Sequence, residues 1–151
     1  MEDTQNALDA HGWLHSGDLG YFTEEGEIYV VDRKKDMIKY LNYQVSPAEI
    51  ESFISTIDGV KAVCVVGIPD IISGDLAAAI IIKDKTSMLL EGDIINQVSR
   101  HFPIFKRLHG GAYFIAELPM TPSGKVKKRI VKQMAMKMYK SNEINGNYER
   151  F

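Results

Sequence analysis

The sequence has little cysteine, no long apolar run and no excess of charge of one sign. Its single cysteine, Cys64, excludes an internal disulfide and favours a reducing compartment. The longest uninterrupted apolar stretch, residues 76–82, has seven residues, far fewer than the roughly 20 needed to cross a bilayer. The 18 basic and 20 acidic side chains give a formal net charge of −2, which argues against a generally cationic binder of nucleic acid or membranes. We therefore expect a soluble protein with no membrane span.

Several catalytic and cofactor motifs are also missing. The chain has no GxSxG elbow, no CxxC pair and no GxGxxG phosphate loop. The segment Thr121–Lys125 resembles a P-loop, but Pro119 and Val126 stand where that motif needs a glycine and a hydroxyl residue. His11 and His15 are four residues apart, but Gly12 and the surrounding turn residues argue against a helical metal site. We expect no bound metal on this chain.

The patterning indicates a domain that mixes helices with strands. The 45% apolar and 25% charged residues are ordinary values for a globular protein. Ser46, Pro47 and Glu49 have the spacing of a capping box at the start of a helix. Strand-like and helix-like segments alternate, which predicts an α+β or small α/β fold. The expected elements are a β-hairpin at 20–31 with Gly26 in its turn, helices at 46–57, 91–102 and 126–140, and strands at 60–68, 76–82 and 111–116.

Two polar segments stand out between these elements. Residues 32–36 are five consecutive charges, which favour a linker or hinge, with an ordinary exposed loop as the alternative. Lys125 comes directly after a Pro-Ser-Gly turn. From there its ammonium could stabilise negative charge that develops on a carboxylate or phosphate. From 118 to 142 there are seven basic residues and no acidic one. This stripe could attract polyphosphate or nucleic acid, or it could be a solvated helix face whose cations lie toward the C-terminus.

Three segments together resemble the adenylate-forming superfamily. They are Gly-Trp-Leu-His-Ser-Gly-Asp at 12–18, the charged and apolar run at 31–49, and the loop at 119–129. The order and spacing are most similar to beetle luciferases, plant coumarate-CoA ligases and related acyl-CoA synthetases, over about residues 12–132. The resemblance implies an α+β C-terminal domain, with a mixed sheet flanked by about three helices and preceded by a β-hairpin from the large domain. Residues 1–34 would then end the large N-terminal domain, and 35–151 would form the lid domain.

The resemblance also implies a reaction and the residues that serve it. An acid reacts with ATP to give an acyl adenylate and pyrophosphate, and a thiol, here CoA, then displaces AMP. Lys125 matches the lysine of the adenylation step, and Lys39 and Gln44 match residues near the nucleotide and the thiolation geometry. The implied ribose partners are Asp18 and Arg33, the implied CoA contacts are Leu41 and Asn42, and the implied hinge, about which the lid exchanges its Lys125 face for its Lys39 face, is Lys35.

The resemblance leaves the substrate and the compartment open. ATP, Mg²⁺ and the small carboxylic acid would bind mainly to the large N-terminal domain of the same enzyme, so this chain alone would be inactive. The relatives have Lys-Gly where this chain has Leu41 and Asn42. The resemblance therefore supports efficient thiolation less strongly than it supports adenylation. The alternatives are a luciferase, or a stand-alone module with a basic helix. The C-terminus does not end in Ser-Lys-Leu, and we expect an intracellular protein, cytoplasmic or peroxisomal.

Overall fold

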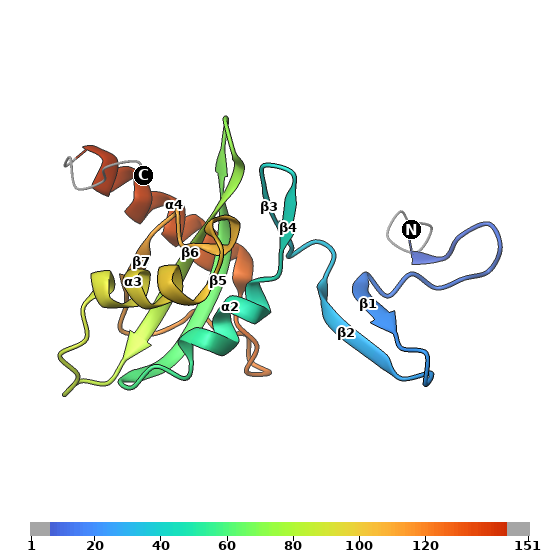
Figure 1. The fold of residues 1–151 in the computed structure, drawn as a ribbon, viewed down its shortest axis with the longest axis horizontal. Coiled ribbons are helices and arrows are strands. Elements are labelled where there is room, and N and C mark those ends of the chain that lie inside the picture. The colour runs from blue at the N-terminus through green and yellow to red at the C-terminus, as the bar shows by residue number, and fades with distance from the viewer. Residues whose placement is uncertain (1–6, 145–151) are drawn as a thin grey trace.

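A hairpin and a mixed domain follow one another along the chain in the computed structural model, which describes residues 7–144 (Figure 1). The C-terminal tripeptide discussed above lies outside these residues. Within them, no helix has both the length and the apolar character to span a bilayer. The strands are β1 (Asp18–Phe22), β2 (Ile28–Arg33), β3 (Ile38–Tyr40), β4 (Tyr43–Val45), β5 (Val60–Asp70), β6 (Gly74–Lys83) and β7 (Ala112–Phe114). The helices are α2 (Pro47–Ile54), α3 (Glu91–His101) and α4 (Lys128–Ile144), with a 3₁₀ turn η1 (Ile104–Lys106).

The mixed domain is built on a five-stranded sheet in which β6 is central. Strand β6 pairs with β5 on one side in antiparallel register from Val60↔Lys83 to Asp70↔Gly74. On its other side it meets antiparallel β3 near its start and parallel β7 near its end. Helices α2 and α3 cover one face of this sheet and α4 covers the other (Figure 1). The expectation of a mixed sheet with three helices and a preceding hairpin is therefore confirmed.

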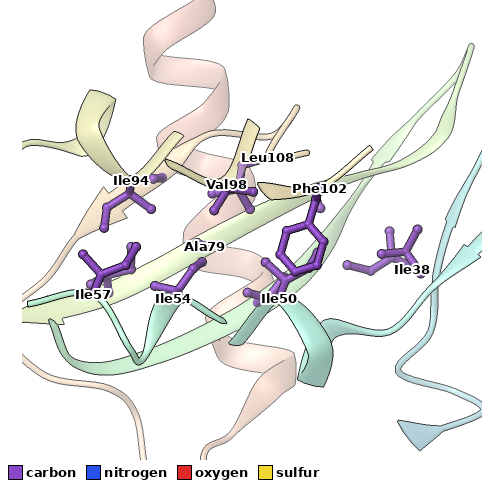
Figure 2. Close-up of a cluster of buried hydrophobic side chains, with 14 residues drawn as sticks. Ile38, Ile50, Ile54, Ile57, Ala79, Ile94, Val98, Phe102 and Leu108 are labelled. Atoms are coloured by element: carbon purple, nitrogen blue, oxygen red, sulfur yellow. The ribbon is translucent and has the colours of Figure 1, made fainter. Parts of the chain in front are cut away.

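Coverage on both faces explains why residues 76–82 of β6 are apolar without interruption. Side chains alternate between faces along a strand, so Ala77, Ala79 and Ile81 join the cluster under α2 and α3, whereas Ala78 and Ile80 join the cluster under α4. A strand buried on both sides loses the usual alternation of apolar and polar residues. Figure 2 shows the first cluster, in which isoleucines of α2 face Ile94 and Val98 of α3.

Most expected elements are present, with small corrections. Ser46 is the N-cap of α2 and accepts the N–H of Glu49. A capping box also needs the Glu49 carboxylate to accept the Ser46 N–H. That part of the prediction is wrong, because the carboxylate instead accepts a hydrogen bond from the Lys106 ammonium at 2.7 Å. Helix α2 ends at Ile54 rather than near 57, and α4 begins at Lys128 and runs past 140. Strands β3 and β4 were not expected. Gly26 has the positive φ expected of it, at 84°.

The β1–β2 hairpin exposes apolar side chains along its length. Every residue of β1 is exposed, and all of β2 except Asp32. Phe22 is 80% exposed and Ile28 opposite it 76%. A lone two-stranded ribbon is only marginally stable in water. The hairpin therefore has the surface of a strand pair that packs against further protein.

Candidate functional site

Two basic segments that are far apart in the sequence meet in one groove. The groove has a volume of about 920 Å³ and lies over Val65, Val66 and Gly67 of β5. Its cationic lining comes from the linker and the start of β3 on one side, and from the Lys125 loop and α4 on the other. The two acidic residues that line it are Asp36 and Asp75. The cationic residues are Arg33, Lys34, Lys35, Lys39, Lys125, Lys127, Lys128, Arg129 and Lys132.

The charge of this groove contrasts with the −2 of the whole chain. Lys128 and Arg129 open α4, its first turn has no acidic residue, and its last turn has no basic one. This placement opposes the helix dipole, which favours cations at the C-terminal end. Lys137 and Lys140 lie in the second half of α4 but before its last turn, so the alternative of a solvated face with cations toward the C-terminus stays open. Because Lys128 and Arg129 lie at the N-terminal end of α4, they do not stabilise the helix through its dipole. Their position instead favours a role in attracting an anion.

A tight turn holds the exposed Lys125 on the lining of the groove. The Thr121 N–H donates to the Lys125 carbonyl at 2.7 Å, and the Gly124 N–H donates to the Thr121 carbonyl at 2.9 Å. The Thr121 hydroxyl oxygen accepts the Lys125 N–H at 3.0 Å. Gly124 takes a φ of 80°, which only glycine adopts without strain. Lys125 is exposed, so its backbone is fixed and its ammonium is free to reach outward.

Asp18 and Arg33, the expected ribose partners, face each other across the hairpin. They are the first cross-strand pair of β1 and β2, and the Arg33 Nε lies 3.0 Å from the Asp18 Oδ1. Both side chains remain partly exposed. The carboxylate keeps further lone pairs and the guanidinium further N–H groups. The pair can therefore accept from and donate to a diol while staying in contact.

Lys39 and Gln44 are neighbours, and the expected CoA contacts lie just beyond them. Lys39 of β3 pairs with Gln44 of β4, and its backbone N–H donates to the Asp75 carboxylate at 3.1 Å. Leu41 and Asn42 form the two-residue turn between these strands, outside the groove. Leu41, rather than Asn42, takes the left-handed conformation, with a φ of 51°. This costs about 1–2 kcal/mol for a residue with a Cβ.

A hydrogen bond holds this strained turn in place. The Leu41 N–H donates to the Ser73 carbonyl at 2.6 Å, so the tip of the β5–β6 hairpin supports the β3–β4 turn. Strained backbone persists where the surroundings over-determine it, and such strain gathers at functional sites. The turn is therefore fixed in position before any ligand arrives.

The expected hinge residue, Lys35, lies in a single turn between the hairpin and the mixed domain. The Lys34 N–H donates to the Gly17 carbonyl at 2.8 Å, which ties the residue before Lys35 to the hairpin. The Asp36 N–H donates back to the Arg33 carbonyl at 2.9 Å, and the Asp36 carboxylate lies 3.7 Å from the Lys128 ammonium. Lys35 is exposed. The Met37 N–H donates to the Arg33 carbonyl as well, at 3.2 Å, so two backbone bonds span Lys35 in this orientation.

Helix α2 carries a partly buried carboxylate that faces β5. Glu51 of α2 accepts the backbone N–H of Val65 at 2.8 Å. Burial raises the pKa of Glu51 above its ordinary 4.5, although the bond from Val65 and the charge of Lys128 oppose this. The folded protein therefore holds the Glu51 proton more tightly than the unfolded chain does.

The raised pKa predicts how stability depends on pH. Because the folded state binds the extra proton, the contribution of Glu51 to the free energy of unfolding falls as pH rises through and above the ordinary pKa. Glu51→Gln keeps an oxygen for the Val65 N–H and removes the charge, so we expect it to be at least as stable as the wild type near neutral pH. Urea denaturation between about pH 4 and about pH 7.5 measures this.

The control for this experiment is Glu51→Ala, which leaves the Val65 N–H without its acceptor. It should be less stable than the wild type throughout the pH range, by about 1–3 kcal/mol. A wild type that gains stability relative to Glu51→Gln as the pH rises would contradict the assignment.

The described residues offer neither a reactive thiol nor a cluster of metal ligands. Cys64 is buried, and burial raises the pKa of its thiol to about 12. A thiol that does not ionise near neutral pH is a poor nucleophile, so the expectation of a buried structural cysteine is confirmed. Residues 7–144 contain no group of three or more histidine, cysteine or acidic side chains placed to hold a metal ion.

Sequence reasoning missed one residue next to the site. Asp32 was expected in an exposed charged linker, but it belongs to β2 and its Oδ2 accepts the Ser46 hydroxyl at 2.7 Å and the Ala48 N–H at 3.1 Å. No local pattern signals a contact between residues 14 to 16 positions apart in a strand and a helix.

Comparison with known proteins agrees with this architecture. The family described as AMP-binding enzyme C-terminal domain matches residues 49–125, about half of the chain. The chain belongs to this family. It is 36% identical over 136 residues to luciferin 4-monooxygenase of Luciola mingrelica and 35% identical over 139 residues to 4-coumarate--CoA ligase-like 1 of Arabidopsis thaliana. These alignments cover 90% and 92% of the chain, but only 25% and 26% of the relatives.

Solved structures place this AMP-binding enzyme C-terminal domain among adenylate-forming enzymes. Over 91% of the chain it matches ATP-bound MatB from Rhodopseudomonas palustris with a TM-score of 0.82 at 28% identity, and apo MatB with a TM-score of 0.69. The chain covers 27% of MatB. It thus spans about a quarter of the length of the relatives that it matches, and its fold is that of the C-terminal domain of adenylate-forming enzymes.

Proposed function

We propose that this chain is the hinge and lid of an ATP-dependent acid–thiol ligase that adenylates a carboxylic acid and transfers the acyl group to CoA. The observation that carries the proposal is the groove in which Lys39, Lys125 and Arg33 meet, within a chain of this family. Residues 35–151 form the lid, and residues 1–34 end a large N-terminal domain. ATP binds in the cleft that the lid closes.

In the first half-reaction, Lys125 supplies positive charge where the acid attacks the α-phosphate. The carboxylate oxygen forms a bond to phosphorus as the bond to pyrophosphate breaks, and negative charge shifts onto the phosphate oxygens. A preorganised ammonium stabilises that shift. Asp18 and Arg33 hold the ribose hydroxyls, so the nucleotide is oriented while the lid is closed. The rest of the groove attracts the polyphosphate.

In the second half-reaction, the lid rotates about Lys35 and presents the Lys39–Tyr43 segment. The thiol of CoA loses its proton to solvent, its sulfur forms a bond to the acyl carbon as the bond to AMP breaks, and AMP leaves. The Leu41–Asn42 turn borders the CoA arm, and its support by Ser73 fixes the shape of that border. Domain closure of this kind lets one cleft serve two reactions.

The hairpin and the lengths of the relatives support the large domain as a partner. Apolar side chains on both strands of the hairpin are exposed in this chain, and about three quarters of each relative lies outside the matched region. Because the described residues hold no cluster of metal ligands, Mg²⁺ would be held by the nucleotide phosphates and the large domain. The acid pocket belongs to that domain as well.

A half-reaction assay on the full-length enzyme tests this function. A panel of aliphatic and aromatic acids is supplied with ATP and CoA, and pyrophosphate and thioester are measured separately. We expect acid-dependent pyrophosphate release followed by thioester, and we expect Lys39→Ala to slow thioester formation more than adenylate formation. Lys85→Ala, on an exposed loop away from the groove, is the control and should leave both rates unchanged.

Two outcomes would count against the proposal. Pyrophosphate release that no acid in the panel stimulates would contradict adenylation. Adenylate that reacts with oxygen and emits light, without thioester, would instead favour the luciferase function, which the similarity to luciferin 4-monooxygenase keeps as the second candidate.

A further inference from the structure

Helix α2 is capped from both sides of the hinge. Its N-cap, Ser46, lies after Lys35 and accepts the Glu49 N–H at 3.4 Å. The Ala48 N–H donates instead to Asp32, which lies before Lys35. The first helical residue, Pro47, has no N–H. Of the backbone N–H groups at the start of α2, that of Glu49 thus binds an acceptor within the lid, Ser46, and that of Ala48 binds an acceptor outside it, Asp32.

The Asp32 carboxylate is well suited to this contact. One oxygen accepts the Ser46 hydroxyl at 2.7 Å and the Ala48 N–H at 3.1 Å, and the other accepts the N–H of Arg33 at 2.8 Å. Partial burial raises the pKa of Asp32, but these hydrogen bonds and Lys128 outweigh it, so the pKa lies below its ordinary value. A carboxylate at a helix N-terminus is favoured by the dipole as well.

The backbone of Asp32 moves with the hairpin and not with the lid. Asp32 pairs with Leu19 in the β1–β2 ladder, and the hairpin extends to Lys34 through its bond to Gly17. Ser46 and Ala48 are fixed to the lid through α2, which packs on β5 and α3. A rotation about Lys35 therefore separates the Asp32 carboxylate from its two donors in the lid, Ser46 and Ala48.

We propose that Asp32 is a positioning residue that latches the lid in the orientation seen here, and that this latch must open each time the lid rotates. The inference rests on the proposed function for its role in the catalytic cycle, and on the hydrogen bonds across the hinge for its existence. Two charge-assisted hydrogen bonds favour the latched orientation. When the latch opens, the Ser46 hydroxyl and the Ala48 N–H can form hydrogen bonds to water instead. The two hydrogen bonds therefore favour this orientation without preventing rotation.

Distance measurement between spin labels tests the latch in the full-length enzyme, where the large domain can cover the exposed hairpin. Labels are attached at Glu24→Cys in the hairpin turn and Lys85→Cys in the lid, both exposed positions, whereas Cys64 is buried and unreactive. We expect a single narrow distance distribution for the wild type. In Asp32→Ala, the fraction of molecules outside that distribution should rise by about tenfold, as expected when a charged hydrogen-bond acceptor is lost.

Two further variants make the result specific. Asp36→Ala removes a carboxylate next to the hinge whose partner, Lys128, lies on the same side of it, and it should leave the distribution as in the wild type. Asp32→Asn keeps an acceptor oxygen without the charge and should give an intermediate result. It also provides the test if Asp32→Ala fails to fold, as judged by circular dichroism. An unchanged distribution in both Asp32 variants would overturn the latch.

The full-length enzyme separates the latch from the proposed function. With Asp32→Ala, the ratio of adenylate-forming to thioester-forming rates should shift by about tenfold, since the balance of lid orientations has changed. An unchanged ratio, with the distance distribution altered, would show that the latch has no part in catalysis. Absence of any acid-dependent pyrophosphate release in the wild type would refute the function but leave the distance result standing.

Discussion

Replacement of Lys125 with alanine is expected to slow acyl-adenylate formation in the full-length enzyme by about 100- to 1,000-fold, the usual cost of removing one preorganised group that stabilises developing charge. The turn from Thr121 to Lys125 is closed by its own backbone bonds, so the substitution removes the ammonium without disturbing its surroundings. The charge acts mainly as the bond to pyrophosphate breaks. The loss should therefore fall on kcat more than on the KM for ATP.

Pyrophosphate release in single-turnover experiments measures this step. Lys127→Ala is the matched control, because Lys127 is exposed and lines the same groove only two residues away. If the groove attracts polyphosphate only through its summed charge, both variants should lose the same small factor. We expect Lys127→Ala to lose no more than about threefold, an effect of charge on association. Equal losses in the two variants would remove Lys125 from its proposed role.

Truncation of Ile50 is expected to lower the free energy of unfolding by about 3–4 kcal/mol. Ile50 lies on the inward face of α2 and is fully buried in the cluster between α2, α3 and the sheet (Figure 2). Ile50→Ala removes apolar contacts and leaves a cavity that the rigid sheet cannot close. Because α2 also carries Ser46 and Ala48, looser packing there would weaken the support of the Asp32 contact.

Urea denaturation of the chain, followed by circular dichroism, measures the loss as a lower midpoint with an unchanged slope. Ile72→Ala is the control, since Ile72 is 76% exposed at the tip of the β5–β6 hairpin. It should change stability by less than about 0.5 kcal/mol. Similar losses in the two variants would contradict the packing described for α2.

The elements that the sequence predicts well are those with a strong apolar period. Ile50 and Ile54 enter the core as a helix stripe requires, and Ile57 is buried although it lies beyond the end of α2. In the run at 76–82, the residues from Leu76 to Ile81 are buried and alternate between the two faces of the sheet. Strands β3 and β4 escaped prediction because each has only three residues. Their connecting turn, with Leu41 in the left-handed position, lacks the glycine that usually signals a tight hairpin.

The candidate site was only partly accessible to sequence reasoning. Lys125 and the charged linker were recognised separately, each from its local pattern. Their meeting in one groove depends on β5 passing beneath both, and sequence spacing carries no information on such an arrangement. Asp32 was misjudged for a related reason. A carboxylate in a run of charges is normally solvated, and its donors in the lid belong to the start of α2, which follows β3 and β4 in the sequence.

The exposed hairpin also affects how this chain behaves in concentrated solution when it is purified by itself. Trp13, Phe22, Ile28 and Val30 are each at least two-thirds exposed, and the outer edges of β1 and β2 have no strand beside them among residues 7–144. Open strand edges with apolar flanks invite pairing between molecules. Purified samples will consequently tend to self-associate as they are concentrated, and a shorter fragment that begins after the linker would be the better choice for crystallisation.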